Sequence, residues 1–175
     1  MVKYVALIRG INVGGHKRFL KTEQLDMLNQ LGLNEPKVYL HTGNWLFKSE
    51  ETKSVLSQKI IKAIQSKFGW EVPVLVLTIS EVKIILENCP FTEEKKQKSY
   101  FVIFSETPAK HLAEEVNKIS YPNEEIVIKD NCLYFYSSVG YGKTKFSMNS
   151  FEKKLQVNAT SRNFNTLNKI LDLSI

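Results

Sequence analysis

A glycine-rich, basic segment, RGINVGGHKR (residues 9–18), is the part of the chain whose residue types are best suited to binding a ligand. It follows an apolar run, residues 4–8, that is typical of a buried β-strand. Glycines let an anion approach successive backbone N–H groups, while guanidinium and ammonium groups add positive charge. The segment therefore predicts an anion-binding loop. Its candidate ligand-binding residues are Arg9, Gly10, Asn12, Gly14, Gly15 and Lys17.

Two segments approach the phosphate-binding loop of nucleotide triphosphatases, G-x-x-x-x-G-K-[ST], and neither completes it. Gly10 and Gly15 have the right spacing, but Arg18 stands where the magnesium-binding hydroxyl residue belongs. In SSVGYGKTK, further along the chain, Ser137 takes the place of the first glycine. A nucleotide triphosphatase is therefore disfavoured, and a simpler anion-holding loop fits the residues better.

Arginine is scarce in this chain, which holds three arginines among 24 basic residues. Two of them, Arg9 and Arg18, flank the glycine-rich segment, and the third is Arg162. The planar guanidinium fork suits phosphate and carboxylate groups. We expect Thr160 or Ser161 to cap a terminal helix, with Arg162 in its first turn, where a bound anion would favour it. Arg162 is thus a further candidate ligand-binding residue.

Groups for catalysis are sparse. His16 and His41 are the histidines that the predicted sheet brings to one edge, where acid–base chemistry is conceivable. The three aspartates are scattered, and no cluster of acids indicates a metal site. Cys89 and Cys132, without a C-x-x-C motif, read as small buried residues rather than as a disulfide framework or a zinc site. No catalytic residue, metal or cofactor is assigned, and whether the protein is an enzyme stays open.

The elements that must position the glycine-rich segment follow the order β-α-β-β-α-β, which is that of a ferredoxin-like sheet. Apolar periodicity and turn residues mark each element. The predicted strands are residues 3–9, 37–41, 44–49 and 72–78, and the predicted helices are residues 22–31 and 52–68.

The same order is predicted to recur after residue 98, although the residues themselves do not repeat. We predict an α+β fold with two ferredoxin-like (βαββαβ) halves, antiparallel sheets and a C-terminal helix. The predicted division is 1–79 for the half with the basic loop, 80–98 for a helix and connector, and 99–175 for the second half with the terminal helix.

Topology brings a second segment to the basic loop. In a ferredoxin-like sheet the first strand lies beside the third and antiparallel to it. The end of the first strand then meets the start of the third, and the turn at residues 42–43 lies at the same edge. Thr42 and Asn44 therefore join the candidate ligand-binding residues. The second half carries nothing comparable, so the site belongs mainly to the first half.

The sequence resembles a bacterial family catalogued as domain of unknown function 1697. The resemblance spans nearly the whole chain in the right order, and it rests on YVALIRGINVGG, YLHTGNWLF and TSRNFNTLNKI. The family's usual Gln-Ser-Gly-Asn is replaced here by residues 41–44, in which Thr42 keeps the hydroxyl, and its usual Trp by Phe164. The resemblance implies a pair of ferredoxin-like halves and assigns no activity.

Composition narrows the function classes. The chain of 175 residues is 43% hydrophobic and 24% charged, which is ordinary for a globular protein. Its net charge of +6 is compatible with anionic partners, but lysines on solvated helix faces explain it better. The apolar run at the start is too short and wrongly flanked for a signal peptide or a membrane span, so a cytoplasmic location is expected and no membrane partner is. The sequence leaves the oligomeric state open.

Three functions stay open from the sequence. The favoured one is a binding protein or unassigned enzyme that holds an anionic small molecule, such as a phosphorylated one, at the basic loop. The second is an RNA- or DNA-binding module, since Trp45 and Phe47 lie on one side of a strand as stacking aromatics would. The strand lacks the RNP1 pattern, however, and we expect both aromatics to be core residues. The third is a protein-interaction or structural role.

Overall fold

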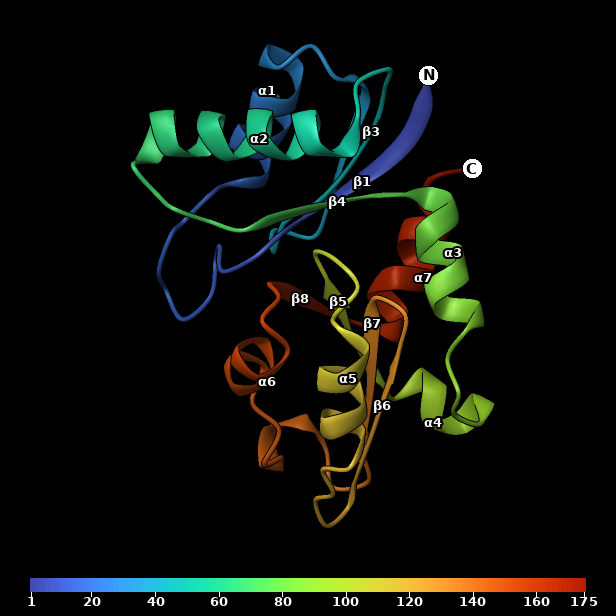
Figure 1. Cartoon of the computed structure of the whole chain (residues 1–175). Coiled ribbons are helices and arrows are strands. Elements are labelled where there is room, and N and C mark those ends of the chain that lie inside the picture. Colours follow the sequence, from blue (N-terminus) through green and yellow to red (C-terminus); the bar gives the residue numbers. More distant parts are fainter. The chain divides into compact units, whose positions relative to one another are not determined.

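A computed structural model describes residues 1–175, and the chain divides into two compact units (Figure 1). The first unit comprises Met1–Lys83 together with Ile170–Ile175, and the second comprises Ile84–Lys169. Each unit holds one four-stranded antiparallel sheet with helices packed on it. The predicted α+β fold class, with two antiparallel sheets and a C-terminal helix, is confirmed.

The first sheet has the strand order β2-β3-β1-β4, which places β1 beside β3 and antiparallel to it, as the ferredoxin-like topology requires. Helix α2 ends at Gly69, whose φ of 70° gives the left-handed cap. The elements that build or follow this sheet are β1 (Val2–Ile8), α1 (Lys21–Gln30), β2 (Asn34–Tyr39), β3 (Asn44–Ser49), α2 (Lys53–Phe68), β4 (Val74–Thr78) and α3 (Ile79–Glu87).

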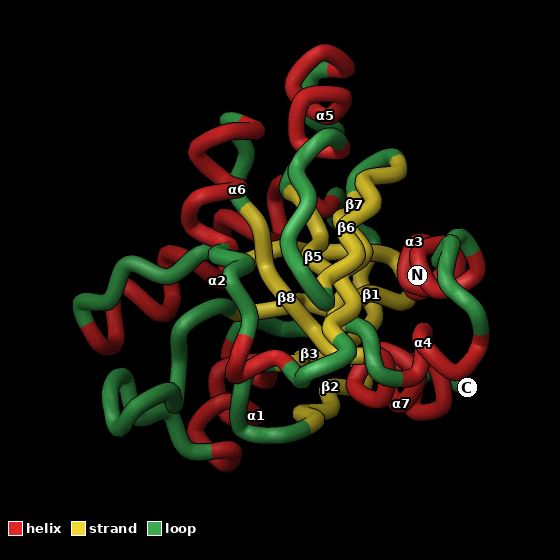
Figure 2. The backbone as a smooth tube through the Cα atoms, turned by 90° about the horizontal axis from the view of Figure 1, so that it is seen from below, coloured by secondary structure: helices red, strands yellow, loops and turns green.

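The second sheet repeats this topology with the order β6-β7-β5-β8. Helices α5 and α6 lie on one side of it (Figure 2). The remaining elements are α4 (Glu93–Gln97), β5 (Tyr100–Phe104), α5 (Lys110–Asn117), β6 (Glu124–Lys129), β7 (Cys132–Ser137), a 3-10 turn (Tyr141–Lys143), α6 (Met148–Leu155), β8 (Ala159–Asn163) and α7 (Phe164–Leu173).

The core of the first unit lies between its sheet and helices α1 and α2. Trp45 and Phe47 face these helices and pair across the sheet with Ala6 and Tyr4. Trp45 is fully buried, and its Nε1 donates to Gln24 Oε1 at 2.6 Å, so the one polar atom of the indole is satisfied. The expectation that both aromatics are core residues is confirmed.

The two sheets have equivalent strand orders, and each makes equivalent backbone hydrogen bonds at the end of its first strand. The amide of Ile8, at the end of β1, donates to Gly43 O at 2.8 Å, and the amide of Phe104, at the end of β5, donates to Asn131 O at 2.8 Å. One residue further on, Arg9 N donates to Pro73 O at 3.0 Å and Ser105 N to Asn158 O at 2.8 Å. The order of elements therefore recurs as expected, and the two halves have the same backbone topology but different side chains.

The expected helix cap at Thr160 or Ser161 is wrong, and so is the placement of Arg162 in the first turn of the helix. All three residues lie within β8, where Arg162 pairs with Phe101 of β5. The helix cap is one residue after Arg162: Asn163 Oδ1 accepts from Thr166 N at 2.9 Å. Pairing with β5 satisfies the backbone of this segment, so the capping preference of its hydroxyl residues is overridden.

Helix α7 follows β8 as α3 follows β4. Thr78, the last residue of β4, accepts from Glu81 N at 3.1 Å and caps α3, in the position that Asn163 holds for α7. Each repeat is therefore a βαββαβ sheet followed by a capped helix, and the C-terminal helix is part of the repeated design rather than an appendage.

The packing around Gly43 predicts a strong effect of Gly43→Ala. The residue has φ 91°, and an added Cβ would lie 2.8 Å from Ile8 Cβ and 3.1 Å from Ile8 O. Left-handed strain and this overlap together should lower the free energy of unfolding by about 2–5 kcal/mol, measured by urea denaturation. Gly69→Ala is the matched control, because Gly69 has φ 70° but open space around its Cβ position, and should lose only about 1–2 kcal/mol. Equal losses in both variants would contradict this account.

Candidate functional site

The glycine-rich segment and the β2–β3 turn lie against each other at the end of β1. Besides the bond from Ile8 to Gly43 O, the side chains of Ile8 and Ile11 pack on the face of Gly43, which has no room for a Cβ. Ile11 is fully buried, so it anchors the loop to the core. The topology thus brings together the two segments that the sequence predicted would meet.

The side chain of Asn12 ties the loop to this turn. Its Nδ2 donates to Phe19 O at 2.8 Å and to His41 O at 2.5 Å, while its Oδ1 accepts from Phe19 N at 2.9 Å. Asn12 adopts φ 54°, a left-handed conformation that asparagine tolerates better than most residues. Asn12 therefore shapes the edge from inside the loop, with both amide hydrogens used.

Gln24, which was not predicted from the sequence, holds the same two segments together as Asn12 does. This fully buried side chain on α1 donates from Nε2 to Phe19 O at 2.9 Å and to His41 O at 3.0 Å. Its Oε1 accepts from Trp45, so the loop, the turn and the core are joined through one amide. The sequence did hold a clue, because a glutamine amid the leucines of an amphipathic helix is a polar residue that needs partners when buried.

Gly14 and Gly15 form the tip of a short hairpin. Val13 and His16 pair as an antiparallel bridge, and His16 N donates to Val13 O at 3.1 Å. The φ values of 58° and 78° at the two glycines are those of a type I′ turn, which needs positive φ at both central positions. The turn by itself therefore accounts for this pair of glycines. Two adjacent glycines are the sequence pattern of such a turn.

Gly10 and several cationic side chains lie at the exposed end of β1. Gly10 is exposed, has φ 76° and meets no atom within 4 Å of its Cβ position, so its backbone is accessible. Arg9 is half-buried, and Lys17 Nζ donates to Glu71 O at 3.0 Å. The segment before β4 is thus a third part of this edge, which the sequence reasoning also missed. The other cationic or titratable side chains here, His16, Arg18 and His41, are exposed.

Thr42 and Asn44 differ in their access to solvent. Asn44 is fully buried, and its Nδ2 donates to Tyr39 O at 2.9 Å, which closes the β2–β3 turn. Thr42 is partly exposed at the surface of the same turn. The β2–β3 turn therefore carries a positioning residue, Asn44, and a surface hydroxyl two residues earlier, at Thr42.

Arg162 belongs to the second unit. Its Nη1 donates to Thr160 Oγ1 at 3.1 Å and to Ser161 O at 2.8 Å, so its guanidinium group is held along β8. Burial lowers the pKa of Arg162 to about 10, which leaves the group charged at neutral pH.

Neither cysteine is activated. Burial raises the pKa of the Cys89 thiol and, more strongly, that of Cys132, so both are protonated at neutral pH. No group of three or more His, Cys, Asp and Glu side chains is gathered in a way that could hold a metal ion. No helix combines the length and apolar character needed to span a bilayer.

The repeated βαββαβ sheet with a capped helix, and a basic glycine-rich loop in the first repeat alone, define a duplicated ferredoxin-like α+β protein. The family model described as "Protein of unknown function (DUF1697)" matches residues 1–134, so the chain belongs to this family. A solved structure of a conserved bacterial protein from Streptococcus pneumoniae is similar over 99% of both chains, with 22% identity and a TM-score of 0.75. That similarity supports the fold. Comparison with curated proteins gives no match.

The hydrogen bonds of Asn12 predict that its side chain stabilises the folded protein. Asn12→Ala would leave the buried Phe19 amide without its acceptor, whereas Phe19 O and His41 O keep Gln24 as a donor. The free energy of unfolding should fall by about 1–3 kcal/mol in urea denaturation. His16→Gln, at the exposed tip of the same loop, is the control and should change it by less than about 0.5 kcal/mol. An Asn12→Ala protein as stable as the control would show that the clamp is not structural.

Proposed function

We propose that the first unit binds a small anionic ligand, such as a phosphorylated metabolite, at the end of β1. The observation that carries this proposal is the rigid junction of the glycine-rich loop with the β2–β3 turn, fixed by the amides of Asn12 and Gln24. A loop held in this way needs little ordering when a ligand binds, which favours affinity.

The proposed contacts are divided between backbone and side chains. Gly10 offers an open backbone, Arg9 and Lys17 offer charge, and Thr42 offers a hydroxyl. Asn12 and Asn44 position these groups from within, and Gly14 and Gly15 supply the hairpin tip.

Charge supports an anionic ligand. The residues of the first unit include 12 Lys and Arg against 8 Asp and Glu. Lys17, at the proposed site, donates to a main-chain carbonyl, which accepts a hydrogen bond without cancelling the positive charge. The edge therefore keeps a surplus of positive charge beside an accessible glycine backbone.

The RNA- or DNA-binding alternative loses the feature that suggested it. Trp45 and Phe47 are buried beneath α1 and α2, so neither can serve as a stacking platform for bases. The net charge alone favours no nucleic acid over a small anion, and the small-anion proposal is the one the site geometry supports.

Titration with inorganic pyrophosphate tests the proposal. In ¹⁵N-edited NMR spectra at low ionic strength, the amide signals of Gly10, Gly14, Gly15 and Lys17 should shift saturably. Arg9→Ala should weaken binding by roughly ten-fold, because a charged hydrogen-bonding group is removed. Lys62→Gln, an exposed lysine of α2, is the control for loss of one charge.

Two results would contradict the proposal. One is the absence of saturable shifts at the loop amides with pyrophosphate. The other is an Arg9→Ala protein that is as stable in urea as the parent and binds pyrophosphate with unchanged affinity.

A further inference from the structure

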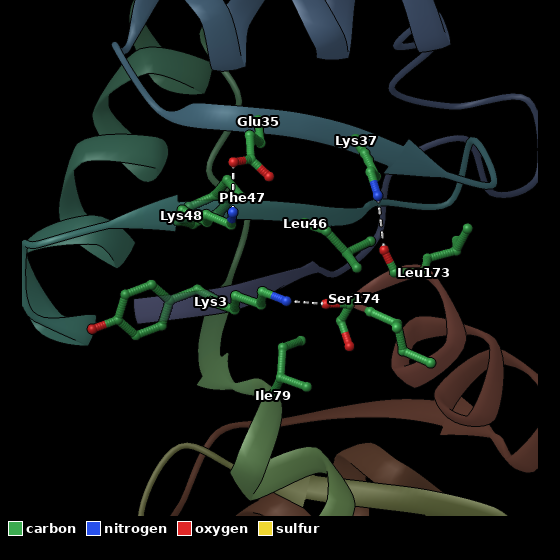
Figure 3. A pocket seen from close by; sticks show the side chains of 11 residues that line it. Lys3, Glu35, Lys37, Leu46, Phe47, Lys48, Ile79, Leu173 and Ser174 are labelled. Carbon is green, nitrogen blue, oxygen red and sulfur yellow. Dashed lines mark hydrogen bonds and ion pairs between the residues drawn. The ribbon is translucent and has the colours of Figure 1, made fainter. Parts of the chain in front are cut away.

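A second basic feature lies at the other end of the first sheet. A cavity of about 190 Å³ is lined by residues of β1, β2 and β3, by the start of α3 and by the end of α7, all within the first unit (Figure 3). Lys3, Lys37 and Lys48 reach it from three adjacent strands, and Glu35 is the one acidic residue in its lining. The apolar part of the lining includes Leu46, Ile79 and Leu173.

The register of the sheet places these lysines at neighbouring positions on adjacent strands. Lys3 on β1 pairs directly with Lys48 on β3, and Lys37 on β2 pairs with Leu46, two residues before Lys48. Like charges directly opposite each other destabilise a pair of strands. The arrangement therefore needs negative charge nearby, either from the protein or from a ligand.

The protein supplies only part of that negative charge. Lys48 Nζ bonds Glu35 Oε1 at 2.5 Å, and this bond holds the pKa of the Glu35 carboxyl below its usual value. Lys37 Nζ donates to Leu173 O at 2.9 Å and Lys3 Nζ to Ser174 O at 2.6 Å, as the dashed lines in Figure 3 show. Carbonyl groups at a helix end carry partial negative charge, yet they are neutral overall. Among the side chains that line the cavity, three ammonium groups thus face one carboxylate.

The size of the cavity points to a compact ligand. Pockets that hold drug-sized molecules have volumes of about 300–1,000 Å³, and this one is smaller. Ammonium groups on adjacent strands, each able to donate three hydrogen bonds, match a group with several charged oxygens. Phosphate, with up to two negative charges near neutral pH, satisfies this better than a single carboxylate.

We propose that this cavity binds a phosphate group, held by Lys3, Lys37 and Lys48, and that Glu35 competes with the ligand for Lys48. The site is separate from the one at the glycine-rich loop, because the strand from Lys3 to Ile8, where that loop begins, is about 17 Å long. Since Lys3 and Lys37 also hold the carbonyls at the end of α7, a bound phosphate draws these donors away from Leu173 and Ser174.

The test relies on two substitutions with opposite expected effects. In a titration with inorganic phosphate at low ionic strength, the amides of Lys3, Lys48 and Ser174 should shift saturably in NMR spectra. Lys48→Gln should weaken phosphate binding by roughly three- to ten-fold, and Glu35→Gln should strengthen it by a similar factor. Glu35 is exposed, so its replacement should leave the fold intact. Lys62→Gln, with no expected change, is the matched control.

Several results would overturn the proposal. They are shifts that grow linearly without saturation, equal weakening by Lys48→Gln and Lys62→Gln, an affinity that does not rise in Glu35→Gln, or acetate binding as tightly as phosphate. Arg9→Ala should leave these shifts unchanged while it affects the amides of Gly10, Gly14 and Gly15. The two sites can therefore fail independently in the same spectra.

Discussion

Two side-chain amides determine the shape of the edge on which the proposed function rests. Asn12 and Gln24 both donate to Phe19 O and His41 O, so two carbonyls from segments far apart in sequence are held by the same pair of donors. Gln24 also accepts from the buried indole of Trp45, which extends the bonding into the core. Because a buried polar group is costly when unpaired, loop, turn and helix can satisfy these groups only in one arrangement. The rigidity of the edge follows from that requirement.

Comparison of the two halves distinguishes the backbone features that the fold requires from the features that occur only in the first half. Both halves make the same two hydrogen bonds at the end of their first strand, at Ile8 and Arg9 and at Phe104 and Ser105. These bonds close the sheet and demand no particular side chain. The glycine-rich loop, the left-handed Asn12 and the crowded Gly43 occur in the first half alone. Features that the shared scaffold does not require are the ones for which a function is the natural explanation.

The sequence predicted most of the fold because apolar periodicity reports burial, and burial decides these strands and helices. It placed Trp45 and Phe47 in the core and joined the glycine-rich loop to the β2–β3 turn, since both follow from strand order. It misplaced residues 160–162, because a hydroxyl-rich segment satisfies both a cap and an edge strand until pairing with β5 is known. The role of Gln24 was not predicted for a related reason. Its three partners lie in separate segments that only the folded chain brings together.

The two proposed sites have one feature in common, which is the kind of group that their lysines contact. Many lysines meet glutamates, as Lys98 meets Glu94 at 3.2 Å and Lys59 meets Glu51 at 3.1 Å, and these pairs cancel their own charge. Lys3, Lys17 and Lys37 instead donate to main-chain carbonyls. A carbonyl fixes the direction of an ammonium group but leaves its charge in place, so such a lysine is oriented and still able to attract an anion. Lysines of this kind stand at both ends of the first sheet, which is why the net charge of the chain, weak evidence by itself, becomes informative once their partners are known.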